Sequence, residues 1–359
     1  MGHRVVIFAC HPSKASSARP PDKMQADPSE WNPEGVVVVH HAKNREAVPF
    51  EDLVRAAQKH HVTDALMLET CHPHIFLLSA ALTAQAGVRV FAVPNIEMVR
   101  RSELGDLQKM RFHQILCSNQ YTYEVLRHFK VPLDKLALFP FAIRDNTDST
   151  PLAALHAQGE PVRFLLVGGM NAERRKQASK VIQAFATAFR TAHGAATLTV
   201  LCQGTDVPKL RQRPQNVTIV HQHLAYSQIM QYYAASHVVI MLSRAEGIGL
   251  STYEAMRARC AVLTMETAMF KELIDPAVNG WFIKYQVEQG TEGAKLLGNL
   301  DPIVHTYTFD TMALVAAFQA IASDGGAGVS RMQAGARRSF ELMFAPQRVT
   351  EAYARALRA

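Results

Sequence analysis

The sequence from 243 to 256 reads Ser243-Arg-Ala-Glu246-Gly-Ile-Gly249-Leu-Ser-Thr-Tyr-Glu254-Ala-Met256. It follows an apolar run at 237–242 that is typical of a buried strand, and it leads into a helix-like segment at 251–259. The two glycines between them let the backbone approach a ligand closely. The start of the following helix offers unpaired N–H groups and a positive dipole end, which suit a phosphate. The stretch therefore predicts a strand–turn–helix unit with an anion site at its turn.

Two carboxylates flank this turn, Glu246 before it and Glu254 within the helix. A carboxylate that faced a phosphate would be repelled, so we expect both to accept hydrogen bonds from neutral hydroxyl groups, such as those of a ribose and a sugar. Ser251 and Glu254 also fit a capping box, which stabilises a helix start without any ligand. On these two residues alone, capping and ribose binding are equally good interpretations. Glu246 and the glycines favour the ligand.

Alternation of strands and helices runs through most of the chain, from residue 5 to 139 and again from 163 to 265. Buried apolar strands that alternate with helices predict parallel sheets covered on both faces. A polar, proline-containing break lies between the two halves. We therefore expect an α/β protein with two Rossmann-like, doubly wound domains. The expected boundaries are 1–145 for the N-terminal domain, 146–161 for a linker, 162–340 for the C-terminal domain and 341–359 for a terminal helix that packs back towards the N-terminal domain.

The composition limits the possible classes of protein. Hydrophobic residues make up 48% of the 359 residues, and a net charge of +7 is scattered in small groups without a long basic run, so we expect no nucleic-acid partner. Five widely spaced cysteines predict no disulfide framework, which favours a reducing, cytoplasmic setting. No apolar stretch approaches the ~18 residues of a membrane span. Contact with the cytoplasmic face of a membrane is therefore expected to be peripheral at most.

The glutamate pair, together with its surroundings, resembles the signature of family-4 retaining glycosyltransferases, the glycosyl transferases group 1 of the GT-B fold. Upstream, Gly168-Gly169 and then Arg175-Lys176 resemble the family's glycine turn and phosphate-binding basic residues. Downstream, residues 271–275 and 278–283 resemble its segment after the next strand. The similarity covers about residues 160–285, and it is weak over 1–150. It implies two Rossmann-like domains that face each other across a cleft, with the donor site in the C-terminal domain.

The resemblance implies a role for each residue of a donor site. Glu254 would hold the donor ribose and Glu246 the transferred sugar. Lys176 and Arg175 would neutralise the pyrophosphate. The first strand of this domain is expected to end at the glycine turn, after residue 167. The other donor-binding positions would be Gly168, Gly169, His223, Leu224, Gly247, Ile248, Gly249 and Leu250.

Candidates for the remainder of the site follow strands of the first half. His72 and His74 follow the strand 65–68, and Asn95 and Glu97 follow the strand 88–93, at the strand ends where α/β sheets bind ligands. By resemblance, His72 would face the donor sugar as a catalytic residue. A loop histidine in solvent is an equally good interpretation. We place Glu97, Asn95 and His74 on the acceptor side.

The sequence departs from the family pattern at four places. The usual residues there are a glycine-rich turn after the first strand, an arginine before the lysine, a Gly-x-Pro after the motif helix and a glycine-proline pair before the next helix. The replacements are Cys10-His11-Pro12-Ser13, Asn171, Arg259-Cys260-Ala261 and Thr267-Ala268-Met269. These changes affect the acceptor side and the shape of the sugar pocket, and they leave the nucleotide-diphosphate site mostly intact.

The resemblance implies a retaining hexosyltransferase that uses a UDP- or GDP-sugar and a glycan, lipid or other acceptor, and we expect it to need neither a metal nor a cofactor. The sequence has no Asp-x-Asp motif, and its histidines complete no zinc-ligand pattern. Two other classes stay open. A sugar-nucleotide epimerase would need acid and base residues on both faces of the donor. A non-catalytic nucleotide-sugar-binding scaffold protein would explain the missing first glycine turn.

Overall fold

The structure is a computed structural model, and it describes fourteen ranges of the chain. They are residues 5–9, 36–40, 50–59, 61–68, 73–102, 104–105, 112–139, 143, 151–210, 212–288, 303–324, 326–345, 348 and 351. The chain divides into two compact units, Met1–Val93 with Lys109–Ile115, and Pro94–Gln108 with Leu116–Ala359. The domain boundaries expected from the sequence stay a prediction.

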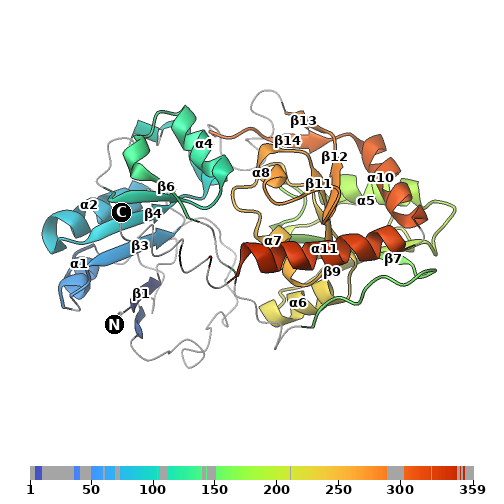
Figure 1. The fold of residues 1–359 in the computed structure, drawn as a ribbon, viewed down its shortest axis with the longest axis horizontal. Coiled ribbons are helices and arrows are strands. Elements are labelled where there is room, and N and C mark those ends of the chain that lie inside the picture. Colours follow the sequence, from blue (N-terminus) through green and yellow to red (C-terminus); the bar gives the residue numbers. More distant parts are fainter. Residues whose placement is uncertain are drawn as a thin grey trace. The chain divides into compact units, whose positions relative to one another are not determined.

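Short parallel strands and two helices make up the first unit (Figure 1). Its elements are β1 (Val5–Ala9), β2 (Val36–His40), α1 (Phe50–Lys59), β3 (Asp64–Leu68), α2 (Pro73–Ala86) and β4 (Arg89–Val93). β1 pairs in parallel with β2, and β3 pairs in parallel with β4. The latter pair belongs to a four-stranded sheet of order β3-β4-β5-β6, completed by β5 (Gln114–Cys117) and β6 (Leu136–Leu138). The last four residues of β4 and all of β5 are buried, as expected for parallel strands covered on both faces.

The second unit is built around a six-stranded parallel sheet of order β12-β11-β10-β7-β8-β9. Its strands are β7 (Val162–Asn171), β8 (Ala196–Asp206), β9 (Val217–His221), β10 (Val238–Met241), β11 (Ala261–Met265) and β12 (Gly280–Ile283). Its main helices are α4 (Gln120–His128), α5 (Ala178–Ala188), α6 (Tyr226–Ala234), α7 (Leu250–Arg257), α8 (Ala268–Lys271), α10 (Thr311–Ser323) and α11 (Ala327–Met343). Small elements are β13 (Tyr285–Val287), which pairs antiparallel with β14 (Tyr307–Phe309), and two 3₁₀ turns, η2 (Ile96–Met98) and η3 (Leu133–Lys135).

Two hydrophobic cores cover the two faces of this sheet. Successive side chains of a strand point to opposite faces, so Phe164 and Leu166 lie in one core while Leu165 lies in the other. The first core includes buried residues of α5 and α10, such as Phe185 and Phe318, which pack edge to face at 5.3 Å between ring centroids. The second core includes residues of α6, α7 and α11. Figure 1 shows α11, in red, running along this unit.

The strand order makes the sheet doubly wound, because the chain moves outward from β7 to β9 and then returns to place β10 on the other side of β7. In such a sheet the connections leave neighbouring strands in opposite directions, so a crevice opens at their carboxyl ends. Here that point lies between the ends of β7 and β10. The prediction of a doubly wound α/β sheet is confirmed for this half of the chain.

One predicted boundary is wrong, because β7 does not end at the glycine turn. It continues to Asn171, with shifts in its register against β8 around Gly169, whose φ is 57°. A side chain at Gly168 would collide with Ala172 and with the carbonyl of Leu201. The glycines therefore allow an irregular strand to continue close to β8, which itself extends to Asp206.

The polar stretch 11–35, which the sequence pattern predicts to be a loop, lies outside the described residues. So do most of the segments 103–111 and 346–357, which the pattern predicts to be helical. The sequence interpretation also missed several short elements that the structure describes, namely η2, η3, β12, β13 and β14.

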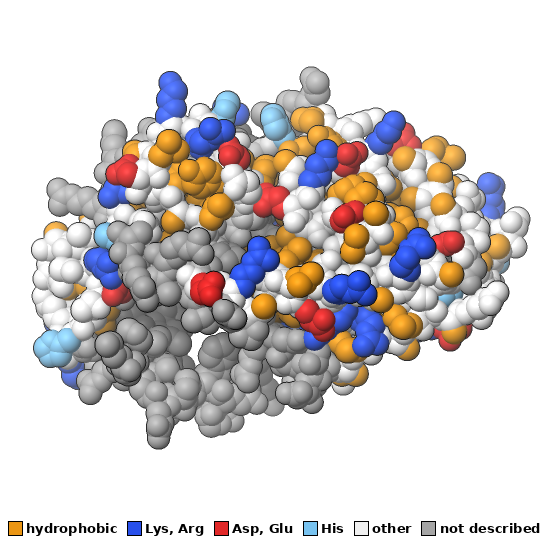
Figure 2. Space-filling view, in the orientation of Figure 1, with side chains coloured by type: hydrophobic (Ala, Val, Ile, Leu, Met, Phe, Trp, Pro, Cys, Tyr) orange, Lys and Arg blue, Asp and Glu red, His pale blue; other side chains and the backbone are white. Residues whose placement is uncertain are grey.

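Within the described part of the chain, no single helix is long and apolar enough to span a membrane. The helices α10 and α11 are long and apolar enough for a span only when they are taken together, and the angle between them is 100°. Acidic, basic and hydrophobic side chains are interspersed on the face in Figure 2.

His237, directly before β10, is a fully buried imidazole whose Nε2 lies 3.9 Å from Glu160 Oε2. Its Nδ1 accepts a hydrogen bond from the backbone N–H of Arg163 at 3.2 Å, and its ring packs against His156 with 4.6 Å between centroids. Burial, with the nearby Arg163 and His156, lowers the pKa of His237 from 6.5 to about 3.

We expect this histidine to make the fold sensitive to mild acid. Between about pH 6.5 and 3 the unfolded chain binds a proton at His237 that the folded chain does not, so the free energy of unfolding falls as pH falls, by at most about 1.4 kcal/mol per pH unit. Urea unfolding at about pH 7.5 and about pH 5 measures the loss. The variant His237→Asn, which keeps an acceptor but cannot titrate, should lose less stability. Equal losses in both proteins would contradict this account.

Candidate active site

The chemistry-bearing side chains of the second unit gather where β7 and β10 end. A turn after β7 carries Arg175 and Lys176, and the loop after β10 carries Glu246. The two segments are joined through their backbones, because the N–H of Arg244 donates to the carbonyl of Arg175 at 2.9 Å. The cluster therefore lies at the crevice that the strand order creates.

Buried hydrogen bonds fix the turn that carries the two cations. The carbonyl of Asn171 accepts from the N–H groups of Arg175 and Lys176 at 3.2 and 3.1 Å. The next residue, Gln177, is 2% exposed and has a left-handed φ of 55°. Its Nε2 donates to the carbonyl of Leu242 at 2.9 Å, which ties the turn to the end of β10. The sequence interpretation gave no role to Gln177, which follows the basic residues directly.

Glu246 is held by both cations. Its Oε1 accepts from Lys176 Nζ at 2.5 Å, and its Oε2 accepts from Arg175 Nη2 at 2.7 Å. The side chains of Glu246 and Lys176 are only 6% and 11% exposed, and that of Arg175 is 26% exposed. Arg175 Nε also donates to the carbonyl of Ala245 at 3.1 Å, which fixes the plane of the guanidinium group. Three residues that the sequence assigned to a donor site thus form one buried cluster.

The cluster keeps Glu246 ionised. Burial alone would raise the pKa of Glu246, but Arg175 and Lys176 outweigh it and lower this pKa to about 2. Burial lowers the pKa of Lys176, and the attraction of Glu246 opposes that shift. A carboxylate with this environment can accept hydrogen bonds from hydroxyl groups at any physiological pH.

The two helices that begin at this crevice differ in how their first turns are satisfied. At the start of α5, Glu173 Oε2 accepts from the N–H of Ser179 at 2.9 Å, so the helix carries its own carboxylate there. Arg174 bonds away from the cluster, to Asp206, at 2.8 Å through its N–H. The start of α7 has no side-chain cap among the described residues. An external anion therefore fits the start of α7 better than that of α5.

The capping-box interpretation of Ser251 and Glu254 is wrong. The N-cap of α7 is Gly249, with a left-handed φ of 72°, so Ser251 and Glu254 lie inside the helix and too late for a capping box. Glu254 instead accepts from Tyr233 Oη at 2.9 Å, and Tyr226 also hydrogen-bonds to it. Burial raises the pKa of Glu254, while these hydroxyl donors partly offset that shift. Its carboxylate is thus already bonded to hydroxyl groups.

Glu97, from the turn η2, also reaches this cluster. Its Oε1 lies 3.3 Å from Arg175 Nη2, and its side chain is 6% exposed. It packs directly onto Gly247, where any side chain would overlap Glu97 Oε2. Gly247 is also held by Asn119, whose Nδ2 donates to the carbonyl of Gly247 at 2.5 Å. The residue that the sequence placed on an acceptor side therefore touches the loop of Glu246.

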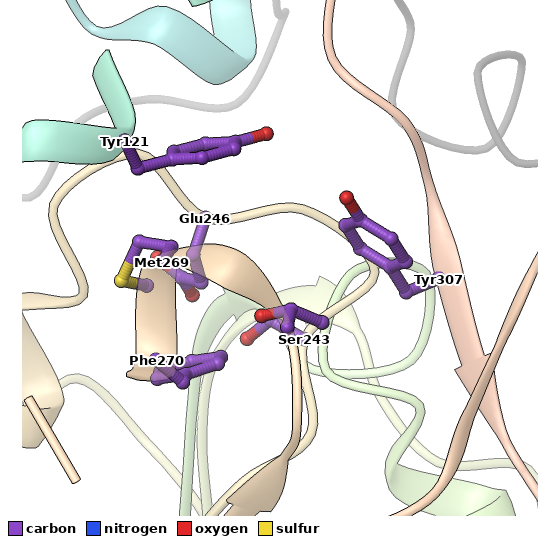
Figure 3. A pocket seen from close by; sticks show the side chains of 7 residues that line it. Tyr121, Ser243, Glu246, Met269, Phe270 and Tyr307 are labelled. Carbon is purple, nitrogen blue, oxygen red and sulfur yellow. The ribbon is translucent and has the colours of Figure 1, made fainter. Parts of the chain in front are cut away.

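A small pocket opens beside Glu246. Figure 3 shows Tyr121, from α4, and Tyr307, from β14, with both hydroxyl groups directed towards the space between the two rings. Hydroxyl groups and apolar side chains share the lining, which consists of Tyr121, Ser243, Glu246, Thr267, Met269, Phe270 and Tyr307. The sequence analysis identified neither tyrosine as a site residue. Each lies in a segment far from the glutamate motif in the chain, and no sequence motif surrounds it.

The remaining predicted residues have varied positions. Gly168 and Gly169 lie in the irregular end of β7. His223 is exposed, whereas Leu224 is buried in the core beside α6. Ile248 is half-buried and Leu250 is 44% exposed at the start of α7. His72 and the side chain of His74 lie outside the described residues, within which no three His, Cys, Asp or Glu residues gather as a metal site would require.

Comparison with known proteins agrees with this geometry. Residues 161–297 match the sequence profile of the family described as glycosyl transferases group 1. A search of curated proteins found no match to this sequence.

Several solved structures share the fold. TarM of S. aureus is similar with a TM-score of 0.65 and 12% identity over 86% of this chain, which spans only 58% of TarM. HepE of Anabaena, solved with UDP and glucose, has a TM-score of 0.66 and 12% identity over 90% of this chain and 85% of its own. Sucrose-phosphate synthase of Thermosynechococcus elongatus has a TM-score of 0.60 and 14% identity, with 90% and 82% covered. The chain has the GT-B fold of these glycosyltransferases.

We expect Lys176→Met to release part of the constraint on Glu246. With one cation lost, the pKa of Glu246 should rise from about 2 towards its ordinary value of 4.5. A depressed carboxyl pKa stabilises the fold above the unfolded value and loses that effect as pH falls through the folded value. The variant should therefore be about 1–3 kcal/mol less stable at neutral pH, with a smaller further loss between about pH 4.5 and 2. Urea unfolding across this range measures both quantities. A variant as stable as the parent at neutral pH would contradict the account.

Proposed function

We propose that this protein is a glycosyltransferase that moves a sugar from a nucleotide-diphosphate sugar, a UDP- or GDP-sugar, to a glycan, a lipid or another acceptor. The observation that carries the proposal is the contact of Lys176 and Arg175 with Glu246 at the carboxyl ends of β7 and β10. This places two cations and a hydroxyl-accepting carboxylate at one point of the region that matches the glycosyl transferases group 1 profile.

The two cations have donors to offer a diphosphate. Lys176 Nζ carries three N–H groups, and among the described residues only Glu246 accepts one of them. Arg175 carries five N–H groups and uses Nε and Nη2 for its contacts within the cluster. The start of α7 adds backbone N–H groups and a positive dipole end. We propose that these groups together bind the pyrophosphate of the donor.

The two glutamates lie where neutral hydroxyl groups of the donor would be recognised. Glu246 borders the pocket of Figure 3, whose lining combines hydroxyl groups and apolar side chains, and we propose that Glu246 contacts a hydroxyl group of the transferred sugar. Glu254 already accepts from tyrosine hydroxyls, and a ribose diol offers the same kind of donor. We propose that Glu254 holds the ribose.

In the proposed reaction, the bond between the anomeric carbon and the diphosphate oxygen breaks while the acceptor oxygen bonds to the anomeric carbon. The acceptor proton passes to the departing phosphate oxygen. Lys176, Arg175 and the N–H groups of α7 would stabilise the charge that develops on this leaving group. Front-face attack of this kind retains the anomeric configuration and needs no covalent nucleophile. With two cations at the leaving group, transfer should continue in the presence of a chelator.

A thermal-shift screen tests the proposal directly. A ligand that binds only the folded state stabilises it by about 2.7 kcal/mol at one hundred times its dissociation constant. UDP, GDP and ADP sugars are compared, with the Lys176→Met variant as control, in which we expect nucleotide binding to be weaker by ~1.5–3 kcal/mol. If none of these donors raises the melting temperature, the proposal is wrong. Binding with release of an epimerised donor would indicate an epimerase, and binding without turnover would indicate a scaffold protein.

We propose that the protein works in the cytoplasm, with peripheral membrane contact if its acceptor is a glycolipid. Its composition and its cysteines support this setting. The acceptor side is expected to include Asn95 and His74, which follow strands of the first half.

Conservative variants can distinguish the proposed roles of Glu254 and Glu246. Glu254→Gln should leave the melting temperature nearly unchanged and weaken nucleotide binding by ~1–3 kcal/mol, because an amide accepts through one oxygen and without charge assistance. Glu246→Gln should impair sugar transfer more than nucleotide binding, because residue 246 would contact the transferred sugar and not the nucleotide. Calorimetry with the nucleoside diphosphate and steady-state transfer rates measure the two effects. If Glu254→Gln binds the nucleotide like the parent protein, Glu254 is not the ribose ligand.

A further inference from the structure

Glu97 is a second carboxylate on the guanidinium group of Arg175. One nitrogen, Arg175 Nη2, lies 2.7 Å from Glu246 Oε2 and 3.3 Å from Glu97 Oε1. Both carboxylate side chains are 6% exposed. Glu97 also fills the space that a side chain at Gly247 would need, so it contacts both the cation and the loop of Glu246.

The charges of this cluster depend on the proton of Glu97. Arg175 and Lys176 carry two positive charges, and Glu246 carries one negative charge because its pKa is about 2. If Glu97 is ionised, the cluster is neutral overall. If Glu97 carries a proton, the cluster has one net positive charge. Only the second state presents an attractive field to the two negative charges of a diphosphate, because like charges in a poorly hydrated site repel strongly.

Asn95 hydrogen-bonds to Glu97. With its amide oriented so that both of its ends find partners, the nitrogen donates to Glu97 Oε2 at 2.6 Å and to Oε1 at 2.9 Å. A carboxyl group that takes up a proton on one oxygen keeps the other oxygen as an acceptor, so this neighbour can bond to Glu97 in both protonation states.

Four titratable groups on other elements act on Glu97 or respond to it. Arg175 and Lys176 follow β7, Glu246 follows β10, and Tyr121 belongs to α4. Burial raises the pKa of Glu97, Arg175 and Lys176 lower it, and the negative charge of Glu246 raises it further. The raised pKa of Glu97 and the depressed pKa of Glu246 separate two carboxyl groups that share one cation, which is the arrangement that gives such groups different roles.

We propose that Glu97 is a positioning residue for Arg175 and that it takes up one proton from solvent when the diphosphate of the donor binds. The inference rests on the proposed function, since it requires a diphosphate at this site. The proton goes to a carboxylate oxygen of Glu97, and no other bond changes. Loss of the charge on Glu97 leaves Arg175 shared between Glu246 and the phosphate oxygens.

Calorimetry tests the proposal with UDP and, in a parallel series, GDP. Titrations between about pH 7.5 and 8.5, where the nucleotide phosphates are already ionised, are repeated in buffers of different ionisation enthalpy. The wild-type protein should take up as much as one proton per nucleotide bound. Its affinity for the nucleotide should therefore fall by up to about tenfold for each unit by which the pH rises. Glu97→Gln, which is neutral and similar in shape, should show no uptake and a flat pH profile. The control Glu341→Gln removes an exposed ion pair with Arg337 in α11 and should behave as the wild type.

The possible outcomes separate this proposal from the proposed function. Nucleotide binding without proton uptake in the wild type would overturn the proposal alone. Equal uptake in Glu97→Gln would assign the proton to another group, such as Lys176, and would also overturn it. If neither nucleotide binds to the wild type, the proposed function fails as well. Should Glu97→Gln not fold, Glu97→Asp keeps a titrating carboxyl group with a shorter reach, and an uptake profile identical to that of the wild type would overturn the proposal.

Discussion

The buried contact of Lys176 with Glu246 is the constraint on which the site depends. Removing two charged groups from water costs several kcal/mol for each, roughly, and only close pairing offsets that cost. The ammonium and carboxylate groups meet this requirement at 2.5 Å, and Arg175 completes the pairing of the second oxygen. The turn after β7 and the loop after β10 must therefore stay in register, since a displacement of either would leave a buried charge unpaired.

The backbone around this contact is arranged for close approach. The backbone of Gln177 has a left-handed conformation that residues other than glycine seldom adopt. The hydrogen bond from its side chain to the carbonyl of Leu242 stabilises this conformation. On the other side of the contact, Gly249 starts α7 in a left-handed conformation that glycine adopts without strain. The two helices thus begin next to the same cluster, one with its own carboxylate and one without a side-chain cap. This difference, and not helix geometry alone, indicates where an anion belongs.

Much of the fold could be predicted from the sequence, because a buried parallel strand is a short apolar run and a surface helix has a regular apolar stripe. The local cluster was also predictable in part, since Glu246, Arg175 and Lys176 lie in turns with a recognisable pattern. The irregular end of β7 was not predictable, because apolar periodicity does not reveal a shift in strand register or the close approach of Gly168 to the carbonyl of Leu201. Ser251 and Glu254 matched a cap by spacing, whereas the helix start depends on the conformation of Gly249.

Contacts between distant segments were beyond the sequence pattern for a simple reason. Glu97 and Arg175 are 78 positions apart, and no local rule links a turn after one strand to a turn after another. The same holds for Tyr121 and Tyr307, which line one pocket from unrelated elements. A pattern can identify candidate residues on each segment, but which of them meet is decided by how the chain packs.

The strand order of the central sheet has a consequence for how the protein folds. β10 lies beside β7 although β8 and β9 come between them in the chain, and the backbone hydrogen bond from the N–H of His237 to the carbonyl of Arg163 joins residues 74 positions apart. The entropic cost of closing such a loop rises with the logarithm of its length, and folding slows as the mean sequence separation of contacting residues increases. Lys176 and Glu246 follow these two strands, so the charged cluster requires the pairing of β7 with β10. A ligand that binds there therefore stabilises only chains in which these two strands are paired.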